Sequence, residues 1–137
     1  EALERILTEL RDLRGELHAA VADASAQLAD NLRQRLNELL DDDNKLDEGR
    51  LEQEVAYLAT RADVTEELDR LDSHLEAFDA ALTEGGAVGR RLDFLCQEIH
   101  RELTTCGNKA VGTAITPVVL EMKVLLDQLR EQAANLA

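Results

Sequence analysis

The chain has 137 residues, the size of one ordinary domain, and its formal net charge is −14. Hydrophobic residues make up 45% of the sequence, aromatic residues 2%, and proline occurs once, a composition that long helices use and that argues against a strand-rich fold. No apolar run approaches the roughly 18 to 20 residues of a membrane span, and no signal peptide is recognisable. We therefore expect a soluble, cytoplasmic protein that contacts no membrane.

The first predicted element is one long amphipathic helix over about residues 2 to 41, with apolar residues, most of them leucines, at three- and four-residue steps from Leu3 to Leu39. At about 1.5 Å per residue it is about 60 Å long, more than a compact domain of this size needs, so we expect it to project as an arm. The acidic run at residues 41–45 predicts the turn of a helical hairpin. Because the first residue is Glu1 and the helical spacing starts in the first turn, we interpret the chain as a fragment of a longer protein.

Two further helices are predicted between residues 48 and 84. The first ends near Arg61. Asp63, followed three residues later by Glu66, fits a capping box, in which each side chain satisfies a free backbone N–H group, so we expect a new start at Asp63. Gly85 and Gly86 are typical of a helix C-terminus.

The last two helices are predicted over about residues 88–105, where Gly107 and Asn108 stop the pattern, and from Thr116 onward, with Thr116 as N-cap and Pro117 at the first helical position. The elements together predict an all-α fold, a long antiparallel helical hairpin arm plus a small helical bundle. Within this single domain we expect residues 1–47 to form the arm and its turn, and residues 48–137 to form the bundle.

The negative charge is unevenly distributed. Residues 1–84 contain 23 acidic and 9 basic side chains, whereas residues 85–137 contain six of each. RNA-binding modules usually carry a basic patch, so this balance argues against tight RNA binding by the fragment alone. The neutral part, residues 85–137, is where a phosphate backbone meets the least repulsion.

The sequence contains neither a glycine-rich phosphate loop nor a zinc motif, so few of its residues are candidates for catalysis or metal binding. On a helix Cys96 and Cys106 would lie about 15 Å apart, too far for a disulfide, so we expect reduced, semi-buried thiols. Glu98 and Glu102 are four residues apart and would project side by side. Such carboxylates can share a divalent metal ion that activates water, although paired glutamates are more often a solvated face with an arginine partner.

Three stretches carry a resemblance to a known family: RLEQEVAYLATRADVTEELDRLDSHLEAF at residues 50–78, GRRLDFLCQEIHRE at 89–102 and VVLEMKVLLDQLREQAANLA at 118–137. They resemble the C-terminal domain of YicC-like bacterial endoribonucleases, closely over about residues 47–137 and loosely over the first helix. The resemblance implies a metal-dependent, RNA-cleaving enzyme of the bacterial cytoplasm. It also implies a homo-oligomer, a hexamer in the full-length protein, and an N-terminal domain that is absent here.

The matching positions supply the candidate site. The resemblance and the chemistry of the side chains suggest Glu98 and Glu102 as catalytic residues and, together with Glu121 and His74, as ligands of a divalent cation, Mn²⁺ or Mg²⁺. The candidate RNA-binding residues, which would neutralise phosphates, are Arg90, Arg91, Arg101, Lys109 and Lys123. Within this site the chain departs from the family pattern at three positions, His100, Thr104 and Asn108, where family members usually have asparagine, asparagine and serine.

Two hypotheses for the function follow from these residues. In the first, the parent protein hydrolyses RNA phosphodiester bonds with metal bound by carboxylates of the last three helices. In the second, the domain is a non-catalytic helical clamp or oligomerisation module, and the catalytic groups lie in the missing domain. The two hypotheses differ in where the metal ion sits.

Overall fold

The computed structural model describes residues 2–39, 48–110 and 114–135. Within these residues every regular element is an α-helix, which confirms the predicted all-α class. The helices are α1 (Ala2–Leu39), α2 (Glu48–Arg61), α3 (Thr65–Glu84), α4 (Gly89–Lys109) and α5 (Ile115–Ala134). The turn that we expected at residues 41–45 lies outside the described residues.

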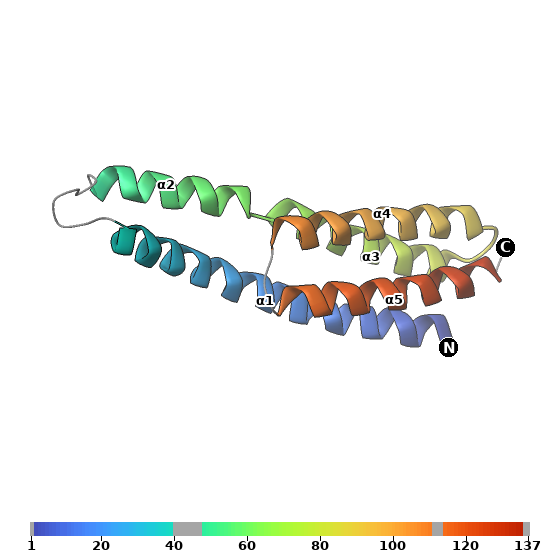
Figure 1. The fold of residues 1–137 in the computed structure, drawn as a ribbon. Helices are drawn as coiled ribbons and strands as arrows, with labels where there is room; N and C mark the ends of the chain where they lie inside the picture. The colour runs from blue at the N-terminus through green and yellow to red at the C-terminus, as the bar shows by residue number, and fades with distance from the viewer. Residues whose placement is uncertain (1, 40–47, 111–113, 136–137) are drawn as a thin grey trace.

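The helices form an elongated molecule in which a four-helix bundle continues into a two-helix arm (Figure 1). The first half of α1 packs against α5 and α3 in the bundle, and its second half runs beside α2 in the arm. Neighbouring helices run antiparallel throughout, as short connections between successive helices favour. Because α3 follows α2 after only three residues, the two helices together span both parts of the molecule.

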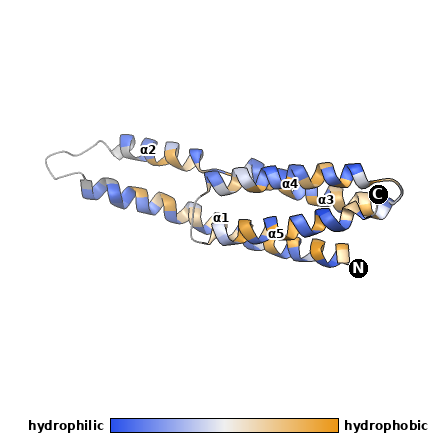
Figure 2. Ribbon diagram, turned by 45° about the vertical axis from the view of Figure 1, so that its right-hand side comes forward, coloured by the Kyte–Doolittle hydropathy of each residue, from blue (hydrophilic) through white to orange (hydrophobic). Residues whose placement is uncertain are grey.

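The core lies between the four helices of the bundle. Hydrophobic and hydrophilic residues alternate along each helix (Figure 2), as expected for helices with one buried face. The buried residues follow the three- and four-residue spacing that puts side chains on one face of a helix. On α3, for example, Leu71, Leu75 and Phe78 are fully buried. The other helices contribute side chains that are as deeply buried, among them Leu10, Leu17, Leu92, Ile99, Leu103, Ile115, Met122 and Leu129.

The structure places the border between arm and bundle elsewhere than our division at residues 47 and 48. The first half of α1 belongs to the bundle, because Ile6, Leu10 and Leu17 are part of its core. The helix α2, which we assigned to the bundle, instead contacts the second half of α1, and Arg33 of α1 donates hydrogen bonds of 2.9 and 3.0 Å to Glu52 of α2. The arm therefore consists of the second half of α1 together with α2.

The helix ends follow local chemistry that the sequence shows only in part. Asp63 accepts hydrogen bonds from the backbone N–H and the hydroxyl of Thr65, at 2.9 and 2.6 Å, but Val64 is the N-cap residue and no side-chain cap bond forms there, so the predicted capping box is wrong. Gly85 and Gly86 both have positive φ, 73° and 77°, which confirms the predicted helix stop. The last helix begins at Ile115, one residue before the Thr116 that we expected as its cap.

None of the described helices is long and apolar enough to cross a membrane.

Candidate functional site on the α3–α4 seam

Two ion pairs join α3 to α4 and fix the register of the two helices. Glu67 of α3 accepts a hydrogen bond from Lys109 of α4 at 3.0 Å, and Arg70 of α3 donates to Glu102 of α4 at 3.0 Å. We call these four residues the α3–α4 seam. The partners are 42 and 32 residues apart in the sequence, and the antiparallel packing of the two helices brings them together.

The Glu102 carboxylate is buried and already neutralised. Its side chain is 7% exposed, and both of its oxygens lie 3.0 Å from the Nε atom of Arg70. Hydrogen bonding to Glu102 raises the pKa of Arg70 above its ordinary value. Arg70 also lies 3.6 Å from Glu66, one turn earlier on α3. Glu102 is thus part of an interhelical contact and is not exposed to solvent as a ligand.

The Glu67 carboxylate is the second buried acid of the seam. Its side chain is 5% exposed, and its Oε1 atom has no hydrogen-bond partner among the described residues, while Oε2 accepts from Lys109. Burial alone would raise the pKa of Glu67, but the bond from Lys109 and the charges of Lys109 and Arg70 bring it below its ordinary value. A buried carboxylate held ionised by a half-exposed lysine is sensitive to any change in that lysine.

Glu98 and His74 extend the seam by one step. The register that pairs residue 67 with 109 and residue 70 with 102 places His74 opposite the part of α4 that holds Glu98. Glu98 is 18% exposed at its side chain and pairs with Arg101 at 3.5 Å, and His74 is half-buried. Two of the four predicted metal ligands, His74 and Glu98, therefore lie at matching heights on the neighbouring helices α3 and α4.

Glu121, the fourth predicted ligand, does not complete a metal site. Glu121 is exposed on α5, and residues 2–39, 48–110 and 114–135 contain no group of three or more His, Cys, Asp or Glu side chains that could hold a metal ion. Hard divalent cations take about six oxygen ligands, of which one or two can be protein carboxylates and the rest water or substrate phosphates. The described residues of this single chain do not by themselves fit a metal ion.

The cations predicted to bind RNA fall into two groups. Arg90, Arg91 and Arg101 are exposed on α4, whereas Lys123 is half-buried on α5. Lys109, at the end of α4, lines a hollow at the base of the arm together with Asn108 of α4 and Arg61 of α2. Four of the five predicted RNA-binding residues thus lie on α4, and only Lys123 lies on α5. Arg61 of α2, which was not predicted, lies near the C-terminal end of α4.

Both cysteines are free and buried, as expected for reduced thiols. Burial raises the pKa of Cys96 and that of Cys106 to about 11. At neutral pH both side chains are protonated thiols, which are poor nucleophiles, and they act as core residues.

Arg70 is a functional candidate that the sequence did not predict. It neutralises one buried acid, Glu102, and lies near another, and no helical pattern on α3 alone distinguishes it from an ordinary surface arginine. The only local signal is Glu66 four residues earlier, which is the common spacing of an intrahelical ion pair.

The fold and the seam define a class of protein: an all-α domain with a helical arm, whose α4 carries arginines and whose α3–α4 interface is held by ion pairs to two buried carboxylates. Residues 17–137 match the family described as "Endoribonuclease YicC-like, C-terminal", and the chain belongs to this family.

Two curated relatives agree with this assignment. The chain is 48% identical over 105 residues to a "Probable endoribonuclease YicC" from Haemophilus influenzae (strain ATCC 51907 / DSM 11121 / KW20 / Rd), covering 76% of this chain and 37% of the relative. It is 34% identical over 158 residues to a protein of the same name from Clostridioides difficile (strain 630), covering 99% of this chain and 54% of that relative. The chain thus spans about half the length of these relatives, or less.

Proposed function

We propose that this domain is the RNA-contacting part of an endoribonuclease that cleaves RNA phosphodiester bonds in the cytoplasm. The observation that carries the proposal is the exposed side of α4, where Arg90, Arg91 and Arg101 stand in a chain whose net charge is −14. Contacts to phosphates are the most economical use of such arginines in RNA binding. Membership of an endoribonuclease-like family supports the same activity.

A divalent cation, Mn²⁺ or Mg²⁺, remains part of the proposal, with Glu98, Glu121 and His74 as the candidate ligands on this chain. The geometry favours Glu98 over Glu102 as the catalytic carboxylate, because Glu102 is already bound by Arg70 on both oxygens. A complete site would need ligands beyond the described residues, from another segment of the full-length protein or from a second copy in a homo-oligomer, such as a hexamer.

The proposal is tested by assaying the full-length protein on labelled RNA with and without Mn²⁺ or Mg²⁺. We expect metal-dependent cleavage that Glu98→Gln abolishes. Glu102→Gln should instead lower thermal stability, since it removes the negative charge that pairs with Arg70. Normal cleavage by the Glu98→Gln protein would refute the site, and absence of cleavage by the wild-type protein under all conditions would refute the activity.

A second function, a non-catalytic clamp or oligomerisation module, is favoured by a different observation. Leu120 and Val124 are each 57% exposed and lie one turn apart on α5, so they form a small apolar stripe on the surface of the bundle. The test is light scattering on the full-length protein with Leu120→Ser and Val124→Ser combined. A smaller assembly supports the module, and an unchanged assembly size rules out this stripe as the contact. Removing residues 1–47 is not a usable test, since it takes Ile6 to Leu17 out of the core.

A further inference from the structure

Phe94 is an exposed aromatic ring on the outer side of α4. Its exposed fraction is 56%, although large apolar side chains elsewhere in the bundle are mostly buried. The helical repeat of 3.6 residues places Arg90 and Arg101 on the same side of α4 as Phe94, one turn before it and two turns after it. We call the set Arg90, Phe94, Gln97 and Arg101 the α4 outer face. All four side chains are exposed, and the set spans about 16 Å along the helix.

The cations of the α4 outer face are exposed to solvent. Arg90 has no carboxylate partner among the described residues, and Arg101 pairs with Glu98 at 3.5 Å but keeps 71% of its side chain exposed. Asp93 is the acid next to Phe94 in the sequence, and Arg130 of α5 holds it at 2.6 Å while Gln97 donates to it at 2.9 Å. An anionic ligand on this face therefore meets two arginines on either side of a ring, and the neighbouring carboxylate is already neutralised.

We infer that Phe94 stacks against an unpaired base of single-stranded RNA, with Arg90 and Arg101 on the flanking phosphates. This stacking rests on the proposed function and specifies its substrate class as single-stranded RNA. Every base presents a flat π face, so an exposed ring between cations binds single strands with little sequence preference. In an A-form duplex the bases are stacked on each other and present no free face to a ring, so Phe94 selects loops and single-stranded segments.

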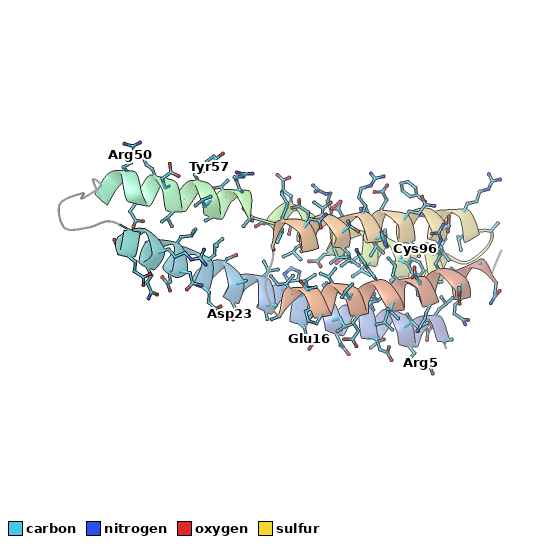
Figure 3. All side chains as sticks on the ribbon, viewed as in Figure 1. Arg5, Glu16, Asp23, Arg50, Tyr57 and Cys96 are labelled. Atoms are coloured by element: carbon cyan, nitrogen blue, oxygen red, sulfur yellow. The ribbon has the colours of Figure 1, made fainter. Side chains whose placement is uncertain are left out.

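Tyr57 provides a matched control. It is exposed to the same degree, 59%, it also lies on a helix, and its side chain points outward from the arm (Figure 3). One face of its ring, however, is occupied by the guanidinium group of Arg61 at 5.9 Å from the ring centroid. Tyr57 is therefore a ring of similar accessibility that lies on the arm, away from the α4 outer face, with one face already taken by a cation.

The first experiment measures the affinity of the 137-residue protein for a short unstructured RNA and for duplex RNA of equal length. Phe94→Leu keeps an apolar side chain and a good helix former but removes the π face. We expect it to weaken single-strand binding by roughly 5- to 150-fold, the range given by base stacking on one aromatic residue. Phe94→Trp should retain the affinity, Tyr57→Leu should leave it unchanged, and no variant should alter duplex binding.

The second experiment uses the fact that the sequence contains no tryptophan. Phe94→Trp introduces the only one, and we expect its fluorescence to be quenched when single-stranded RNA binds and to be unchanged by duplex. Unquenched fluorescence with bound RNA, or wild-type affinity of Phe94→Leu, would overturn the stacking while leaving RNA cleavage by the full-length protein intact. Failure of the wild-type protein to bind or cleave any RNA would overturn the proposed function, and the stacking with it.

Discussion

The Lys109–Glu67 pair gives the sharpest prediction about the α3–α4 seam. Lys109→Met keeps the aliphatic stem of the side chain and removes the ammonium group, so the buried Glu67 loses its donor at 3.0 Å. Hydrogen bonds to charged groups contribute about 1.5–3 kcal/mol, but solvent screens the Lys109 side chain, which is 43% exposed. We therefore expect a loss of about 1–2 kcal/mol at pH 7, or a fall in Tm of about 4–8 °C for a domain of this size.

The pH dependence of this loss tests its cause. Lys109 helps to hold the pKa of Glu67 below its ordinary value of 4.5. A carboxyl group whose pKa is lower in the folded state stabilises the protein above its unfolded pKa, and this contribution disappears as the pH falls through the folded pKa. The difference in Tm between the wild-type and Lys109→Met proteins should therefore be largest near pH 7 and should shrink below pH 4.5.

The assay is thermal unfolding followed by circular dichroism at a series of pH values. Lys123→Met is the matched control, because Lys123 is a half-buried lysine with no carboxylate partner among the described residues, and we expect it to change stability by no more than about 0.5 kcal/mol. If the two lysine variants have the same Tm at pH 7, or if the deficit of Lys109→Met is constant down to acid pH, then Lys109 does not stabilise Glu67 in the way described.

Three other predictions concern the bundle. Phe78→Ala removes a fully buried ring and should lower the free energy of unfolding by about 3–5 kcal/mol in urea titrations. Gly86→Ala should lower it by about 1–2 kcal/mol, because a Cβ is strained at φ 77° although it meets no neighbouring atom, and Gly15→Ala is the control without that strain. Cys96 and Cys106 should react slowly with iodoacetamide at pH 8 in the native protein and rapidly in urea, since burial raises the pKa of both thiols to about 11; rapid alkylation of the native protein would contradict their burial.

The sequence predicted the fold class because helical periodicity is a local signal. Leucines at three- and four-residue steps, and glycines such as Gly85 and Gly86, act on their own turn of chain, so the existence and approximate bounds of the helices follow from them. The cap at Asp63 was predicted less well. Its carboxylate binds Thr65 next to it, and the spacing to Glu66 gives no indication of this alternative.

Long-range packing explains what the sequence did not predict. The leucines of the first half of α1 have the same spacing as those of the second half, and only the presence of α3, α4 and α5 beside them decides which are buried. Glu98 and Glu102 looked equivalent in the sequence for the same reason. Arg70 of α3, 32 residues before Glu102 in the sequence, binds Glu102, whereas Glu98 pairs with Arg101.

The shared helix α1 has a mechanical consequence for the domain. One end of this rod is fixed in the core, against which its side chains pack as far as Ala24, while the part beyond Ala24 is supported by α2, for example through the Arg33–Glu52 pair. The part beyond Ala24 is about 22 Å long, so a tilt of about 5° where α1 leaves the bundle moves its far end by about 2 Å. A small rotation at the base of α1, beside the hollow that Lys109 lines, therefore grows along the arm and is greatest at its tip.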